Sequence, residues 1–431
     1  MTDAFDLFVI GGGPGGYTCA ARAVELGFSV ALAEADQLGG VCLNRGCIPT
    51  KGLLDAPHPD GIGARVADNA RTIERLRRGV GHLLRKVTVF EAAARLAGPG
   101  RVAVDGHGEV TAGKVVIATG STPRGLDLLP FDGTRVLSSD HAVALKQLPG
   151  DVVVIGAGAV GCEFADLLSA YGARVTLVEA AGALLPTEDP WLSEHLTRAF
   201  GRRGIRMHTN TTVEAAEVAG SGVSLTLSGD GQELQADVVL VAVGRTPLTD
   251  GLGLDTVGLS LEAAGHIGVD VHGQSAVDGV YAIGDVVGPP LLAHKAAAQG
   301  RIAAEHAAGR AVNPPGPVPT CVYTHPQIAS VGKGPGVGLV TGEARFSANG
   351  LAVVRSEAEG AVRLVAETAS GRLVGAQLAG PEVTEMVGFL GVMVGAGVTV
   401  QQLAGAVFPH PTCAETVSEA ADRLLARLPS S

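Results

Sequence analysis

The sequence predicts an α/β protein with two Rossmann-like dinucleotide-binding domains and a C-terminal α+β domain. Residues 11–16 and 156–161 both read GxGxxG, and each follows a short apolar run. A proline-rich stretch at 314–319, PPGPVP, leads into a last segment that lacks this glycine pattern. The length of 431 residues agrees with this plan, because about 150 residues per domain gives roughly three domains.

The first glycine-rich turn belongs to a complete pattern of strand, turn, helix, strand and acid. Apolar residues 7–10 and 30–33 predict two strands, residues 17–26 have helical spacing, and Glu34 ends the second strand. Glu34 follows Gly13 by 21 residues, near the spacing that lets a carboxylate hold a ribose hydroxyl. We therefore expect a dinucleotide here, with its pyrophosphate at the helix N-terminus.

The same pattern occurs a second time along the chain. Residues 152–155 predict a strand, a helix extends to about Tyr171, and the strand at 175–178 ends in Glu179, 21 residues after Gly158. Two complete patterns predict two dinucleotides. Glu179 would bind a ribose and repel a 2'-phosphate, and the following AAGALLP has no cation, so we expect NAD and not NADP.

Three further strands run into glycine turns, at 115–121, 238–247 and 279–286. Such junctions would place backbone amides and Asp285 at the carboxyl ends of parallel strands, where nucleotides bind in open sheets. Ordinary hairpin or crossover turns are the alternative interpretation.

The last segment has an α+β pattern. We expect strands at 361–367 and 373–377, an apolar helix near 385–396, and then the stretch FPHPTCAE at 408–415. The predicted domain plan has two nucleotide-binding domains, the first in two parts, and a C-terminal domain: 1–146, 147–247, 248–314 and 315–431.

Composition and charge exclude several classes of function. The net charge is -11 and aromatic residues make up 3% of the chain, which argues against nucleic-acid binding. The start, MTDAFDLFVI, is acidic where a signal peptide is basic, and no apolar run reaches the roughly 18 residues of a membrane span. Six cysteines are too few for a disulfide scaffold, so we expect a reducing cytoplasm and no membrane partner.

Two cysteines separated by four residues, Cys42 and Cys47, lie in the stretch GGVCLNRGCIPTK. Such a dithiol can pass two electrons through a mixed disulfide, and an adjacent flavin could pass them to a nicotinamide. A helix start after Gly46 and the nearby Lys51 would lower a cysteine pKa. The alternative, half of a metal site, lacks a second cysteine pair or a histidine cluster, so we expect no metal.

Taken together, these motifs resemble the class I pyridine nucleotide-disulfide oxidoreductases over nearly the whole chain. Within that family the sequence is most similar to the dihydrolipoamide dehydrogenases, through VCLNRGCIPTK at 41–51, LLAHKA at 291–296 and VYTHPQIASVG at 322–332. The resemblance implies an FAD-dependent NAD(H) oxidoreductase with a redox-active disulfide. It also implies that the C-terminal domain is a dimerisation domain and that the protein is a homodimer.

The resemblance assigns roles to the catalytic candidates. Cys47 would lie against the flavin, Cys42 would exchange with the substrate, and Lys51 would pair with Glu163 where the nicotinamide stacks.

His410 and Glu415 would form an acid–base dyad that serves the dithiol of the other subunit. Read alone, a His-Pro at a helix start is more often a cap. The resemblance also implies the following cofactor-binding residues: Gly11, Gly13, Pro14, Gly16, Glu34, Gly40, Lys51, Thr119, Gly120, Ser121, Asp285, Leu292, Ala293, Gly156, Gly158, Gly161, Glu179 and Gly244.

The chain departs from the family pattern in two short stretches. After Lys51, residues 52–63 read as a proline and glycine turn where relatives continue a helix, and residues 332–342 replace a helical excursion. The first stretch borders the dithiol, so the substrate stays open: a lipoyl arm, another small disulfide or dithiol, or a non-disulfide acceptor such as a quinone or a pathway intermediate. A different class of function is a non-catalytic flavoprotein subunit of a complex.

Overall fold

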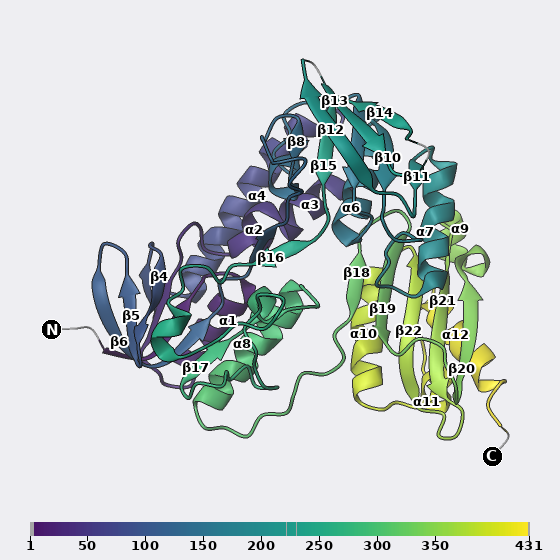
Figure 1. The fold of residues 1–431 in the computed structure, drawn as a ribbon. Coiled ribbons are helices and arrows are strands. Elements are labelled where there is room, and N and C mark those ends of the chain that lie inside the picture. The colour runs from purple at the N-terminus through teal and green to yellow at the C-terminus, as the bar shows by residue number, and fades with distance from the viewer. Residues whose placement is uncertain (1–3, 221, 230, 430–431) are drawn as a thin grey trace. The chain divides into compact units, whose positions relative to one another are not determined.

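The computed structural model describes residues 4–220, 222–229 and 231–429. Residues 1–3, part of the acidic start, lie outside the described residues. The chain divides into two compact units (Figure 1). The first unit comprises Met1–Leu53, Ala64–Arg124 and Gly244–Pro315, and the second comprises Leu54–Gly63, Gly125–Val243 and Gly316–Ser431. The domain boundaries taken from the sequence stay predictions.

The first unit is built on a mixed sheet with a parallel part in the order β3-β2-β1-β6-β17. An antiparallel meander, β4-β5, continues from the first half of β6. The strands are β1 (Ala4–Ile10), β2 (Val30–Ala33), β3 (Thr88–Phe90), β4 (Ala94–Gly98), β5 (Arg101–Val104), β6 (Gly108–Ile117) and β17 (Val280–Ala282). All four residues of β2 are buried, as expected for a parallel strand covered on both faces.

Alternation along β1 separates two hydrophobic cores. Leu7 and Val9 belong to one buried cluster, and Phe8 and Ile10 belong to another, because successive side chains of a strand point to opposite faces. The first face is covered by α1 (Pro14–Glu25) and α8 (Ala293–Ala307), which pack against each other.

Three more helices and several short elements complete the first unit. They are α2 (Gly40–Arg45), α3 (Cys47–Leu54), α4 (Ile62–Leu83), the 3-10 turns η1 (Leu254–Val257) and η2 (Gly284–Val287), and the pair β7 (Ser121–Pro123) and β16 (Arg245–Pro247). The turn predicted directly after Lys51 was wrong in position, because α3 continues to Leu54 and the loop follows it. Gly52 is tolerated in this helix because the Asn69 side chain occupies the place of its Cβ, so packing outweighs the low helix propensity of glycine.

The second unit contains a parallel sheet in the order β11-β10-β9-β15-β8. Its strands are β8 (Val136–Leu137), β9 (Asp151–Ile155), β10 (Arg174–Val178), β11 (Arg206–His208) and β15 (Val238–Val241). Its helices are α5 (Ser139–Ala142), α6 (Ala159–Ala170) and α7 (Pro190–Arg202). An antiparallel meander of β12 (Val213–Ala219), β13 (Gly222–Leu227) and β14 (Glu233–Ala236) accompanies the sheet.

The last part of the second unit is an antiparallel sheet in the order β18-β19-β22-β21-β20. Its strands are β18 (Thr320–Val322), β19 (Gln327–Gly332), β20 (Leu339–Arg345), β21 (Ala361–Glu367) and β22 (Leu373–Gly380). The accompanying turns and helices are η3 (Phe346–Ala348), α9 (Gly350–Val354), α10 (Val383–Gly395), α11 (Val400–Ala404) and α12 (Glu415–Leu425). The strands expected at 361–367 and 373–377 and the helix expected near 385–396 are present as β21, β22 and α10.

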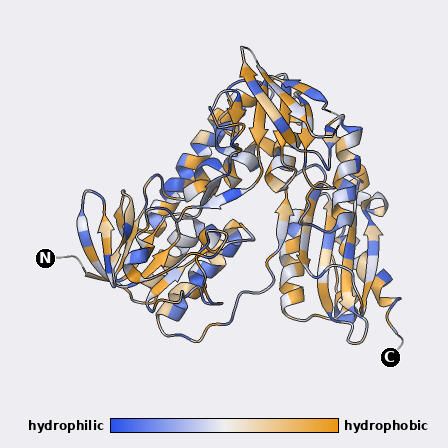
Figure 2. Cartoon of the chain, in the orientation of Figure 1, coloured by the Kyte–Doolittle hydropathy of each residue, from blue (hydrophilic) through white to orange (hydrophobic). Residues whose placement is uncertain are grey.

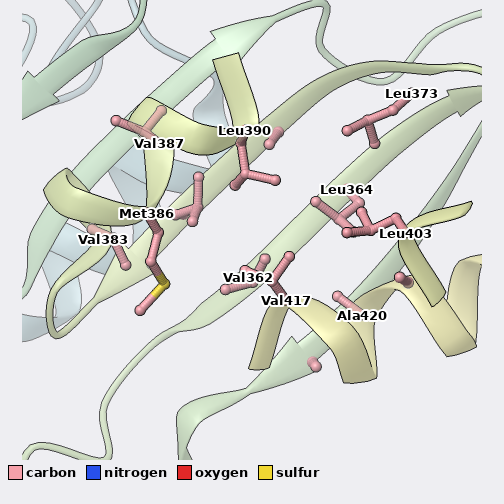
Figure 3. Close-up of a cluster of buried hydrophobic side chains, with 14 of the residues drawn as sticks. Val362, Leu364, Leu373, Val383, Met386, Val387, Leu390, Leu403, Val417 and Ala420 are labelled. Carbon is pink, nitrogen blue, oxygen red and sulfur yellow. The ribbon is translucent and has the colours of Figure 1, made fainter. Parts of the chain in front are cut away.

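The helices of this α+β part share one core with the sheet. Figure 3 shows Met386 and Leu390 of α10, Val417 of α12 and the strand residues Val362 and Leu364 in the same buried cluster. Hydrophobic colouring is concentrated on the strands (Figure 2), in agreement with sheets that form the interior. Within the described part of the chain, no helix has the length and hydropathy that a membrane crossing requires.

Candidate active site

The dithiol lies at a break between two short helices. Cys42 is in α2, Cys47 is the first residue of α3, and Gly46 separates them. A Cβ on Gly46 would lie 3.0 Å from the Val41 carbonyl oxygen and 3.3 Å from the Cys42 Cα. Glycine therefore lets α3 start against the turn that carries Cys42.

Side-chain hydrogen bonds hold both ends of this break. The Asn44 amide donates to the Gly40 carbonyl oxygen at 2.9 Å, and the Thr50 hydroxyl donates to the Gly46 carbonyl oxygen at 2.7 Å. The Asn69 amide of α4 donates to the Pro49 carbonyl oxygen at 2.9 Å. The two sulfurs thus sit on a restrained segment.

The electrostatics distinguish the two thiols. The pKa of Cys42 is raised, first by its hydrogen bond to Cys47, then by burial and by the charge of Cys47, while Lys51 opposes these effects. Lys51 lowers the pKa of Cys42, but hydrogen bonding and burial outweigh this effect. The lowered cysteine pKa expected at the start of α3 concerned the thiolate of Cys47 and stays a prediction. The raised pKa keeps the Cys42 thiol protonated, so it requires a base before it can act as a nucleophile.

Tyr17, in the first turns of α1, is a further site residue that the sequence motifs did not indicate. Burial raises the pKa of the Tyr17 phenol first, and electrostatic interaction with Cys42 and Cys47 raises it further. Its position directly after the glycine-rich turn was the available sequence signal.

The first glycine-rich turn has the geometry of a phosphate-binding loop. Gly11 has a φ of 107°, and a Cβ on Gly16 would lie 1.8 Å from the Gly11 carbonyl oxygen. The Glu34 carboxylate accepts the Gly12 N–H at 2.7 Å and the Asp36 N–H at 2.9 Å. Among the described side chains, none caps the N-terminus of α1, so its amides stay available for an anion.

Gly40 connects this turn with the dithiol. It has a φ of 59°, and a Cβ on it would lie 2.7 Å from the Gly13 Cα. Gly40 is the first residue of α2, two residues before Cys42, so the close approach brings the dithiol helix to the nucleotide-binding turn.

A polar network lies where β6 and β17 end beside each other. The Ser121 hydroxyl donates to the Asp285 carboxylate at 2.6 Å, and Arg245 donates to the Ser121 hydroxyl and carbonyl oxygen at 2.6 and 2.7 Å. Because the strands are parallel, their carboxyl ends share one edge, as expected from the glycine junctions. Arg245 was absent from the predicted site, although its VGRTP junction marked the segment.

Other predicted residues surround the same edge. The Thr119 hydroxyl donates to the Leu248 carbonyl oxygen at 2.7 Å, and Gly120 has a φ of 76°. Leu292 and Ala293 form the start of α8, where no described side chain provides a cap. Pro14 is the first residue of α1.

The second glycine-rich turn repeats the geometry of the first. A Cβ on Gly161 would lie 1.8 Å from the Gly156 carbonyl oxygen. The Glu179 carboxylate accepts the N–H groups of Ala157 and Ala181 at 2.6 and 2.7 Å. A Cβ on Gly158, directly before α6, would have no described atom within 4 Å, so the helix start is open.

Gly244 and Glu163 are the remaining residues of the predicted nucleotide site. Gly244 has a φ of 118° and accepts the Arg124 N–H at 3.0 Å where the chain returns to the first unit. Glu163 lies in α6, is 5% exposed and accepts the Tyr323 N–H at 3.0 Å. Lys51 belongs to the first unit and Glu163 to the second, and their pairing stays a prediction.

His410 and Glu415 are in direct contact. The His410 Nδ1 lies 2.9 Å from the Glu415 Oε1, and Glu415 also accepts the Thr412 N–H at 2.8 Å. The Thr412 amide and then His410 lower the pKa of Glu415, so the carboxylate is anionic and orients the imidazole. The His410 side chain is 78% exposed, which leaves its outer nitrogen free to meet another molecule.

The donor sets suit the two expected cofactors. Both helix starts have open amides, both turns carry a carboxylate after the second strand, and the glycines leave space for a pyrophosphate. No group of three or more His, Cys, Asp or Glu side chains that could hold a metal was found in the described ranges.

The sequence pattern of the pyridine nucleotide-disulphide oxidoreductases matches residues 5–300, and that of their dimerisation domain matches residues 318–421. The chain belongs to this family. As a pyridine nucleotide-disulphide oxidoreductase it is an FAD-dependent enzyme that uses NAD(H) and resembles the dihydrolipoyl dehydrogenases. Its dimerisation domain makes it a homodimer.

Individual relatives support the assignment. A dihydrolipoyl dehydrogenase of Chlorobaculum tepidum is 40% identical over 452 aligned positions, covering 97% of this chain and 96% of the relative. A dihydrolipoyl dehydrogenase of Bacillus subtilis is 35% identical, with coverages of 96% and 97%. The alignment with the first relative is longer than this oxidoreductase itself, so that relative has residues that this chain lacks.

Solved structures share the fold of this oxidoreductase. LpdA of Mycobacterium tuberculosis superposes with a TM-score of 0.91 at 29% identity, covering 97% of this chain and 99% of that one. RclA of Escherichia coli, an HOCl-induced flavoprotein disulfide reductase, superposes with a TM-score of 0.89 at 25% identity, with coverages of 98% and 99%.

Proposed function

We propose that the enzyme exchanges electrons between a dihydrolipoyl-type dithiol and NAD(H) through Cys42 and Cys47. The observation that carries this proposal is the dithiol at Gly46, which Gly40 brings to the first nucleotide-binding turn. FAD supplies a two-electron relay between the sulfurs and the nicotinamide. Relatives named dihydrolipoyl dehydrogenase support the lipoyl group as substrate.

The residues of the chain account for the sulfur and proton chemistry. A substrate thiolate attacks the Cys42 sulfur of the oxidised pair, which forms a mixed disulfide and releases Cys47 as a thiolate. The second substrate thiol gives its proton to His410 and attacks the substrate sulfur of the mixed disulfide. This closes the substrate disulfide and releases Cys42, and Glu415 stabilises the protonated imidazole. The exposed imidazole supports a dyad that serves the dithiol of the partner subunit.

We propose cofactor roles for the cradle residues on the same grounds. The first glycine-rich turn and Glu34 would hold the FAD adenosine and pyrophosphate; the residues of this turn are Gly11, Gly13, Pro14 and Gly16. Asp285 would bind the remaining part of the FAD molecule. The turn at Gly156, Gly158 and Gly161 with Glu179 would hold NAD.

Anaerobic titration of the purified flavoprotein tests the proposal. NADH and dihydrolipoamide, added separately, should each produce the long-wavelength absorbance of a thiolate beside a flavin. Cys47→Ser should abolish this absorbance with both reductants, whereas Cys321→Ser, which changes another half-buried cysteine, should retain it.

Two results would contradict parts of the proposal. A response to NADH without a response to dihydrolipoamide would show an active dithiol with a different substrate, as the altered loop after α3 allows. The absence of the absorbance with every reductant would rule out the dithiol mechanism.

A further inference from the structure

Two buried carboxylates lie on one face of α6. Glu163 is 5% exposed and Asp166 is fully buried, and their three-residue spacing places them one turn apart. Both contact the segment 323–325, which connects β18 to β19. Asp166 belongs to none of the motifs that the resemblance uses.

Asp166 is the centre of a polar network that joins three segments. The His325 Nδ1 donates to its carboxylate at 2.7 Å, and Arg203, directly after α7, forms an ion pair with it. Arg203 also donates to the Asp166 carbonyl oxygen at 3.2 Å and to the His325 carbonyl oxygen at 3.3 Å. The Arg203 guanidinium thus binds both α6 and the segment 323–325.

The network restrains the backbone whose amide binds Glu163. Loss of either partner would leave the buried Asp166 carboxylate poorly compensated, which is costly in free energy. The contacts of Asp166 with Arg203 and His325 therefore restrain all three residues. The planar guanidinium donates in fixed directions, which makes the contact geometrically specific. Tyr323 is two residues from His325, so a shift of this segment would lengthen the Tyr323 hydrogen bond to Glu163.

We propose that Asp166, Arg203 and His325 are positioning residues that hold the Tyr323 amide against Glu163 and thereby set how the enzyme binds the nicotinamide. The inference rests on the proposed function and on the role that the family resemblance implies for Glu163 beside the nicotinamide. In this role the three residues act through Glu163.

The charge state of His325 agrees with this role. The hydrogen bond to Asp166 raises the pKa of His325 above 6.5, against burial and the nearby Arg203, and Glu357 adds a small effect in the same direction as Asp166. Protonated His325 therefore stabilises the network fully below pH 6.5. This stabilisation is lost as the pH rises through the raised pKa of His325.

Adjacent arginines provide a matched test. Arg202 forms an ion pair with Glu359, so it also joins α7 to the C-terminal part of the second unit, but this pair does not involve α6. We compare Arg203→Gln with Arg202→Gln in the full-length holoenzyme. Hydrogen exchange reports the protection of the Tyr323 amide, calorimetry reports the dissociation constant of NAD, and rapid mixing reports flavin reduction by NADH and separately by dihydrolipoamide.

Arg203→Gln should lose protection at the Tyr323 amide, weaken NAD binding and slow reduction by NADH about tenfold, since small misplacements of positioning groups cost this much or more. Reduction by dihydrolipoamide should stay unchanged. Arg202→Gln should resemble the wild type in all four measurements. His325→Ala, at a side chain that is 58% exposed, should act in the same direction as Arg203→Gln and guards against a folding defect.

Equal behaviour of the two arginine variants would overturn the inference, whether both resemble the wild type or both lose NAD binding. A loss of NAD binding with full Tyr323 protection would also overturn it. A wild-type enzyme that NADH does not reduce would instead contradict the proposed function, so the two failures are distinct.

Discussion

At the scale of single residues, the proton on Cys42 decides what the site requires. Its hydrogen bond to Cys47 and its burial raise the pKa of Cys42, so the thiol that meets the substrate is not a thiolate on its own. The opposite holds at the dyad, where the pKa of Glu415 is lowered and its charge supports a protonated imidazole. Thiol exchange at Cys42 thus needs a proton acceptor, the role that we propose for His410, whose Nδ1 lies 2.9 Å from the Glu415 Oε1.

Replacing His410 by Gln should separate the two halves of the reaction. Turnover of dihydrolipoamide should fall at least about 100-fold, the usual contribution of a general base, while NADH should still reduce the flavin at nearly the wild-type rate. Stopped-flow spectroscopy of each half-reaction measures this. His82→Gln, at an exposed histidine of α4, is the control. Equal losses in both halves would count against the assigned role.

At the scale of elements, close backbone contacts decide where helices lie. The contact of α1 with α8 depends on Gly300, since a Cβ there would lie 2.4 Å from the Gly15 carbonyl oxygen. Gly15 is the second residue of α1 and belongs to the nucleotide-binding turn. The contact between the two helices therefore also supports the predicted cofactor site. Gly40 and Gly46 likewise allow close backbone contacts at the starts of α2 and α3.

Gly300→Ala should destabilise the holoenzyme by about 1–3 kcal/mol, because the added methyl group overpacks a backbone contact. Gly79→Ala in α4 should stabilise it by about 0.5–1 kcal/mol, because no described atom lies within 4 Å of its Cβ position and alanine favours helices. Thermal midpoints and flavin release on heating measure both effects. Equal midpoints for the two variants would show that the contact of α1 and α8 is adaptable.

At the scale of the whole molecule, the longer excursion of the chain from the first unit, Gly125–Val243, begins and ends at one pair of strands. β7 and β16 pair where the polypeptide departs to the second nucleotide fold and returns from it, and Arg245 of β16 reaches Ser121 of β7. The polar network of Ser121 and Asp285 is therefore completed by Arg245, which lies more than a hundred residues after Ser121 in the chain.

The dimer should be necessary for dithiol chemistry and dispensable for NADH oxidation. Val407 is 96% exposed and lies three residues before His410, so we expect it to be covered by the partner subunit. Val407→Glu should yield monomers that NADH reduces but that fail to turn over dihydrolipoamide. Light scattering and the two half-reaction rates measure this.

Val271→Glu, at a valine of the first unit that is 62% exposed, is the matched control and should stay dimeric. Monomers of Val407→Glu with full dihydrolipoamide turnover would show that the dyad serves its own chain.

Much of the site could be predicted because its signals are local. The two glycine-rich turns, their carboxylates Glu34 and Glu179 and the dithiol are set by spacings of a few to about twenty residues, which one strand, turn and helix translate directly into geometry. The sequence therefore determined the fold class, both nucleotide folds and the redox-active pair.

The tertiary structure decided the features that depend on distant residues and on burial. Arg245 at Ser121, Tyr17 near the thiols and Asp166 with Arg203 and His325 join segments that no short pattern connects. The direction of the Cys42 pKa was also decided there, because the balance between the Lys51 charge, burial and the Cys47 hydrogen bond exists only once the chain has enclosed the sulfur. The spacing of residues close in sequence thus predicts the topology and the cofactor chemistry. The burial of side chains and the contacts between distant residues exist only once the chain has folded.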